Sequence, residues 1–113
     1  MQITIADLQG YLSEHYSSWA DEQGLFMKLV EEMGEVAEVL NQRAKRKDGA
    51  KENLDEQLGC ELADMLHYIV AIAAVNGLDF NKIVLEKDRS ASIKYHRERN
   101  LEQYIAQKKA GHV

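Results

Sequence analysis

The segment LVEEMGEVAEVL, residues 29–40, decides the fold because it combines an apolar stripe with glutamates at helical spacing. Apolar side chains recur every three or four residues through 25–45, which is the period of an amphipathic α-helix. A second segment, ELADMLHYIVAIA at residues 61–73, is apolar almost all round in its second half. A helix of that kind has to be surrounded by other helices, so the two segments predict an all-α bundle.

The sequence on either side of these segments also has helical patterning. Polar connections are expected at residues 21–24 and 43–56. Gly77 is expected to end the third helix, and Asp79 is expected to cap the fourth. The chain contains no proline, which fits a sequence written mainly as helix. We therefore expect a bundle of four to five helices, over residues 5–19, 25–45, 54–76, 79–95 and part of the tail after residue 100.

Length and composition are those of one ordinary globular domain, residues 1–113, with 45% hydrophobic residues. The formal net charge of −5 disfavours binding to a nucleic-acid polymer. Cys60 has no second cysteine for a disulfide, and no signal-like N-terminal segment is visible. The strongly apolar run at residues 65–75 is too short to span a bilayer. We therefore expect a cytoplasmic protein without a membrane anchor.

Acidic residues stand three apart in both segments, as Glu32 with Glu35 and as Glu61 with Asp64. At about 100° per residue, Glu32 and Glu61 both fall inside the apolar sectors of their helices. The second acid of each pair, Glu35 or Asp64, follows three residues later and so has the same angular offset in both helices. Two antiparallel helices with this register would bring four carboxylates to one partly buried place.

Two further glutamates of the first segment, Glu31 and Glu38, fall about 100° to 120° from Glu32 on the polar side of the helix. They are therefore interpreted as solvated, or as outer residues behind a site formed by the buried carboxylates.

An acidic pair on a helix is usually a solvated surface feature. Four carboxylates in a partly buried place are different, because they must be protonated or bind cations. Oxygen donors without a neighbouring histidine or cysteine favour a hard ion, Mg²⁺ or alternatively Mn²⁺. Such an ion binds phosphates and activates water, so hydrolysis of a phosphate ester or anhydride is the predicted chemistry. The chain has no GxxxxGK[ST] loop to hold the phosphates.

The acidic spacing EExxE followed by ExxD resembles the signature of the MazG-like, all-α nucleoside triphosphate pyrophosphohydrolases. The apolar pattern around the acids and the connection NGLDF at residues 76–80 are similar as well. The resemblance covers a core of about residues 25–95. It implies a helical bundle, assembled as a homodimer or a dimer of dimers. The implied reaction is hydrolysis of a nucleoside triphosphate to a monophosphate and pyrophosphate, as nucleotide-pool housekeeping.

In that family the metal ligands are the second and third acids of EExxE and both acids of ExxD. They match four residues here: Glu32, Glu35, Glu61 and Asp64. The resemblance implies that Mg²⁺ bridges these acids and the triphosphate. The catalytic role, which is to orient or deprotonate the attacking water, then belongs to Glu32 or Glu35.

The resemblance also suggests substrate contacts from basic residues. Family members often carry a lysine where Lys28 stands, although an i,i+4 pair with Glu32 is the alternative for this residue. Lys87 fits the lysine of a Lys-x-x-x-Asn pattern on the last helix, but Ala91 replaces the asparagine. The basic residues of this helix are either phosphate contacts or solvated surface: Lys87, Arg89, Lys94 and Arg97.

Two other features have a functional and a structural interpretation. Trp19 either stacks on a nucleobase or packs in the core. The basic segment 43–51 is either a lid over phosphates or a solvated loop.

Two alternative functions remain open at the level of sequence. Phosphoribosyl-ATP pyrophosphohydrolase has a similar fold and acidic frame, with the same chemistry on a different substrate. A non-catalytic helical interaction protein would use the same acids to hold a structural metal ion.

Overall fold

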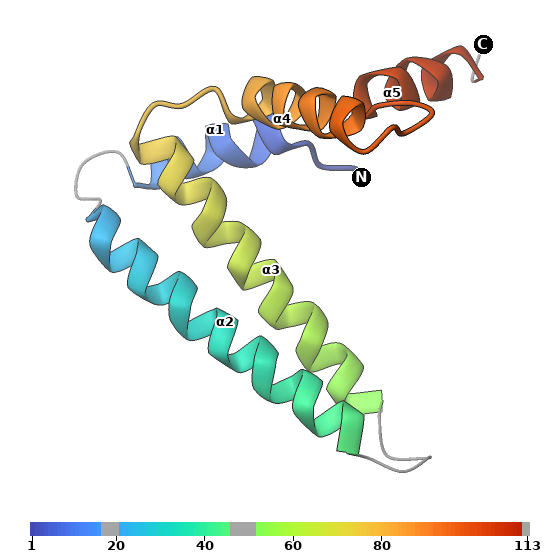
Figure 1. Ribbon diagram of the computed structural model, residues 1–113. Coiled ribbons are helices and arrows are strands. Elements are labelled where there is room, and N and C mark those ends of the chain that lie inside the picture. The colour runs from blue at the N-terminus through green and yellow to red at the C-terminus, as the bar shows by residue number, and fades with distance from the viewer. Residues whose placement is uncertain (17–20, 46–51, 112–113) are drawn as a thin grey trace. The chain divides into compact units, whose positions relative to one another are not determined.

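The computed structural model describes residues 1–16, 21–45 and 52–111, with the side chain of residue 52 excepted (Figure 1). These parts of the chain form helices without any strand, so the all-α prediction is confirmed. They divide into two compact units, residues 1–78 and residues 79–113, and each unit is described by itself. The helices are α1 (Ile5–His15), α2 (Glu22–Lys45), α3 (Glu52–Val75), α4 (Phe80–Lys94) and α5 (Leu101–Ala110).

The start of α2 differs from the sequence-based prediction, which placed a polar connection at residues 21–24. The helix begins at Glu22, because the Oδ1 atom of Asp21 accepts a hydrogen bond of 3.1 Å from the backbone N–H of Gln23. This side chain satisfies one of the free donors of the first turn, as helix-capping residues do. The expected connection is therefore helical from Glu22 onward.

The other boundaries shift by a few residues. Helix α1 ends at His15, and the remainder of the predicted helix, residues 17–20 with Trp19, lies outside the described residues. The expected connection at 43–56 is shorter, because α2 extends to Lys45 and α3 begins at Glu52. Residues 46–51 of the proposed basic lid also lie outside the described residues.

Gly77 ends α3 as predicted. Its φ of 64° is the left-handed conformation that glycine adopts without steric cost. The backbone N–H of Gly77 donates to the carbonyl of Ala74 at 3.1 Å, and that of Leu78 donates to the carbonyl of Ala73 at 3.0 Å. This pair of bonds is a Schellman motif, which satisfies the last carbonyl groups of the helix.

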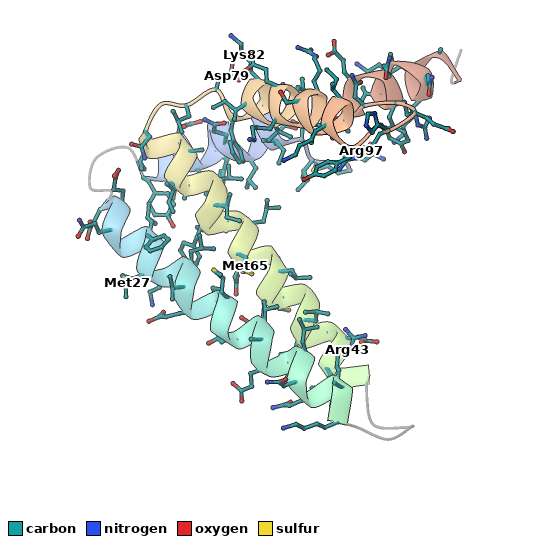
Figure 2. All side chains as sticks on the ribbon, viewed as in Figure 1. Met27, Arg43, Met65, Asp79, Lys82 and Arg97 are labelled. Atoms are coloured by element: carbon teal, nitrogen blue, oxygen red, sulfur yellow. The ribbon has the colours of Figure 1, made fainter. Side chains whose placement is uncertain are left out.

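Within the first unit, α2 and α3 run antiparallel beside each other, and α1 packs against α3 (Figure 1). Arg43 of α2 forms an ion pair of 3.4 Å with Asp55 of α3, near the end of this hairpin that is remote from α1 (Figure 2). The buried apolar residues come from all three helices and include Leu12, Leu25, Val39, Leu54 and Val70. The antiparallel arrangement is the one needed to bring the acidic pairs together.

Part of the hairpin surface is apolar and exposed in a single chain. On α2, exposed apolar side chains recur at helical spacing, and α3 has a similar stripe. These residues are Phe26, Val30, Met33 and Leu40 on α2, and Leu62, Leu66 and Ile69 on α3. By length and composition alone, the stretch Asn53–Val75 could also cross a bilayer, because its most apolar window of 18 residues has a mean hydropathy of 1.6. Core helices of soluble proteins share that property, so it assigns no membrane role by itself.

In the second unit, Asp79 caps α4 as predicted, since its Oδ1 accepts from the backbone N–H of Lys82 at 3.2 Å. The short fifth helix is also present, with Asn100 as its cap. Asp88 of α4 joins the two helices, because its Oδ2 accepts a 2.6 Å hydrogen bond from the backbone N–H of Leu101.

Candidate metal centre

Carboxylates of α2 and α3 converge in the groove between these helices. One oxygen atom from each of Glu32, Glu61 and Asp64 lies within 4.8 Å of the others. Glu32 comes from α2, and the other two stand one turn apart on α3. Glu32 and Glu61 are half-buried, whereas Asp64 is exposed. The cluster is therefore partly accessible to solvent.

Two oxygens of the cluster are buried and lack a hydrogen-bond partner within the described part of the protein. They are Oε2 of Glu32 and Oε2 of Glu61. A buried acceptor without a donor is costly, and an uncompensated carboxylate costs more than a neutral group. Such atoms indicate that a proton or a cation completes the site.

The pKa of Glu61 shows how strongly the carboxylates interact. In its protonated form Glu61 can donate a hydrogen bond to Glu32 or to Glu35, and this hydrogen bonding, followed by desolvation and the repulsion of both neighbours, raises the pKa of Glu61 from 4.5 to about 8. Glu35 therefore belongs to the same cluster, although its side chain is exposed. Without a metal ion, Glu61 therefore keeps its proton to a higher pH than an ordinary glutamate does, and shares it with its neighbours by hydrogen bonding.

These observations fit a divalent cation. A positive ion would replace the shared proton, satisfy the two buried oxygens and remove the repulsion that raises the pKa of Glu61. The donors are carboxylate oxygens without nitrogen or sulfur, which suits a hard ion such as Mg²⁺ or Mn²⁺. Glu32, Glu35, Glu61 and Asp64 would hold it.

Glu31 and Glu38 lie at the edge of the cluster. Glu31 is exposed and forms an ion pair of 3.4 Å with Lys28. Glu38 is also exposed and lines a cavity of about 320 Å³ together with Glu35 and Glu61. Both side chains are thus exposed, and Glu38 shares a cavity with two residues of the cluster.

A second cavity, of about 350 Å³, lies where α1 ends and α2 begins. Lys28 lines it, so this cation stands beside the cavity and pairs with Glu31 rather than with Glu32. The other lining residues are Tyr16, Asp21, Gly24, Leu25 and Tyr68. Sequence reasoning did not single out Tyr16, Asp21 or Tyr68. The available signal was that Tyr68 follows Asp64 by one helical turn.

The basic residues of α4 belong to the second unit. Arg89 forms a 2.5 Å ion pair with Glu102, and Arg97 forms a 3.4 Å pair with Asp88. The ammonium group of Lys94 lies 5.4 Å from the centre of the Tyr95 ring. The side chain of Lys87 is exposed. These contacts give two of the predicted phosphate-binding arginines acidic partners within their own unit.

Comparison with known families identifies the domain. Residues 21–92, more than half of the chain, match the model of the MazG nucleotide pyrophosphohydrolase domain. The chain belongs to the MazG family. A search of curated proteins found no individual match. The MazG match includes α2, α3 and most of α4, and therefore every residue of the carboxylate cluster. MazG domains are nucleotide pyrophosphohydrolases and are typically metal-dependent, which agrees with the chemistry of the cluster.

Proposed function

We propose that this MazG protein hydrolyses a ribo- or deoxyribonucleoside triphosphate to the monophosphate and pyrophosphate, with Mg²⁺ as cofactor. The observation that carries the proposal is the convergence of Glu32, Glu61 and Asp64 within 4.8 Å, in a domain of this family. The two buried oxygens without donors support a bound cation. A role in cleaning the nucleotide pool is consistent with this activity.

The proposed roles of the residues follow from their burial. Mg²⁺ would neutralise charge on the phosphoryl oxygens and lower the pKa of a bound water. Glu61 and Asp64 would hold the ion from α3, and Glu32 would hold it from α2. Glu35 is exposed beside Glu61, so it or Glu32 accepts the proton of the water that attacks the α-phosphorus.

The test is a measurement of products. Purified protein with Mg²⁺ is incubated with nucleoside triphosphates and with phosphoribosyl-ATP, and release of monophosphate and pyrophosphate is measured. We expect turnover of a nucleoside triphosphate. Turnover of phosphoribosyl-ATP alone would assign the alternative substrate. Absence of turnover on the whole panel, with retained metal binding, would indicate a non-catalytic metal-binding protein.

Two substitutions test the carboxylates directly. Glu32→Gln and Glu61→Gln each replace a charged ligand with a neutral amide of similar size, and we expect kcat/KM to fall at least about 100-fold. Glu56→Gln is the matched control, because Glu56 is an exposed carboxylate of α3 outside the cluster. Full activity in the two cluster variants would contradict the catalytic assignment.

We also propose that the protein acts as a homodimer or a dimer of dimers. The support is the exposed apolar stripe of α2 and α3, which a second copy of the hairpin would cover.

A further inference from the structure

The cavity at the junction of α1, α2 and α3 is lined by residues that stand one helical turn from the carboxylates on both α2 and α3. Lys28 precedes Glu32 by one helical turn, and Tyr68 follows Asp64 by one turn. One turn corresponds to a rise of about 5.4 Å. Because α2 and α3 are antiparallel, both offsets point to the same end of the hairpin (Figure 1). The cavity therefore lies about one helical turn from the metal ligands, toward the end of the hairpin where α2 begins.

One wall of the cavity is aromatic and held in place by contacts between α1 and α3. The side chain of Tyr16 is 7% exposed, and its hydroxyl forms a 2.7 Å hydrogen bond with Nε2 of His67. The His67 ring meets the rings of Tyr16 and Tyr68 edge-on, with centroids 5.8 Å and 4.9 Å apart. Rings fixed in this way offer a preformed surface for a planar ligand.

Asp21 contributes an exposed carboxylate to the lining of this cavity. Its Oδ1 accepts from the backbone N–H of Gln23, which fixes the side chain at the start of α2. Its Oδ2 lies only 3.0 Å from the position that a Cβ atom would take at Gly24. Glycine at position 24 therefore allows the carboxylate to lie over the first turn of the helix, where both residues line the cavity.

An ionised carboxylate accepts hydrogen bonds and cannot donate them. It recognises the exocyclic amino group of cytosine, as aspartate does when proteins read base edges. Uracil presents its one N–H between two carbonyl oxygens, which a carboxylate repels. The charge of Asp21 thus discriminates between bases of nearly equal size.

We propose that this cavity holds the base of the nucleotide and that Asp21 selects bases with an exocyclic amino group. The inference rests on the proposed function, since the carboxylate cluster fixes where the phosphates lie. Lys28, which lines the cavity and precedes Glu32 by one helical turn, then stands beside the phosphate nearest the nucleoside. Asp21 is a specificity-determining residue in this arrangement, and Tyr16 and His67 position the aromatic wall.

The test compares equilibrium binding of cytidine and uridine monophosphates to the full-length protein by calorimetry, with Mg²⁺ present. We expect the cytidine nucleotide to bind at least about 10-fold more tightly, since a specific contact to a base edge discriminates against the wrong base by such a factor. Asp21→Asn removes the charge and adds a hydrogen-bond donor, so the ratio of the two dissociation constants should approach one. Gly24→Ala keeps the acid but displaces it, and should also reduce the ratio.

Glu22→Gln is the matched control, because it removes a carboxylate from the same helical turn outside this cavity, and the ratio should not change. Equal binding of the two nucleotides, or an unchanged ratio in Asp21→Asn, would overturn the inference even if pyrophosphate is released. Discriminating binding without turnover of any triphosphate would support the base site and contradict the proposed catalytic function. The two failures are therefore distinguishable.

Discussion

At the scale of single residues, Glu61 links the metal centre to stability. Its pKa is about 8 in the folded protein and 4.5 as an ordinary glutamate, so the folded state retains a proton that the unfolded chain releases between these values. The stabilisation that Glu61 contributes is therefore fully present below pH 4.5 and is lost as the pH rises through this window.

The corresponding measurement is thermal unfolding in a chelator at pH 5 and pH 8. We expect a lower Tm at pH 8, and we expect Mg²⁺ to restore it by replacing the proton. Glu61→Gln cannot ionise at this position, so its Tm should depend less on pH. A wild-type Tm without this decrease in the absence of metal would contradict the coupling of Glu61 to Glu32 and Glu35.

Tyr16 provides a second residue-scale prediction, which concerns stability rather than metal binding. Tyr16→Phe removes the hydroxyl that bonds His67 across the interface of α1 and α3. We expect a loss of about 1 kcal/mol in the free energy of unfolding, measured by urea denaturation. Tyr11→Phe removes the same group from an exposed ring and serves as the control. Equal effects of the two substitutions would argue against the buried hydrogen bond.

At the scale of elements, the end of α3 depends on one backbone conformation. Gly77→Ala places a side chain at a φ of 64°, which costs an L-residue about 1 kcal/mol or more. We expect a lower free energy of unfolding by urea denaturation. Gly10→Ala is the contrasting variant, because Gly10 lies within α1 and an added Cβ meets nothing within 4 Å. That change should be neutral or stabilising.

Helical register explains why the carboxylate cluster could be predicted from the sequence. The relative directions of Glu61 and Asp64 are fixed by the geometry of one helix, and the same is true of Glu32 and Glu35. The start of α2 is harder to predict, because the polar residues at 21–24 are typical of a connection, whereas Asp21 caps the helix. The residues around a helix cap are as polar as those of a loop, so the local sequence alone does not separate the two.

The cavity could not be predicted in the same way, since its walls come from different helices. Tyr16 approaches His67 and Tyr68 only after α1 packs against α3. The sequence separates Tyr16 from His67 by 51 positions, and no local period relates them. The contacts of Arg89 with Glu102 also depend on how α4 and α5 pack.

At the scale of the whole molecule, the exposed apolar stripe of α2 and α3 predicts self-association. Apolar stripes of this kind are usually buried at interfaces, and two hairpins would form a bundle with a shared core. Met33→Lys and Leu66→Lys place charges in the stripe, one on each helix. We expect the molar mass measured by light scattering to fall from that of an oligomer to that of one chain.

Ile93→Lys is the control for this experiment, because Ile93 is 73% exposed but belongs to α4 in the other unit. It should leave the molar mass unchanged. A wild-type mass equal to one chain would contradict self-association through the stripe. If the stripe variants become monomeric and also lose activity, the cause is either a lost metal site or a lost contribution of the second copy to substrate binding. Thermal unfolding with and without Mg²⁺ separates the two. A Tm raised by Mg²⁺ would mean that the carboxylates of a single hairpin still bind the ion, and that the second copy contributes to the substrate side of the site.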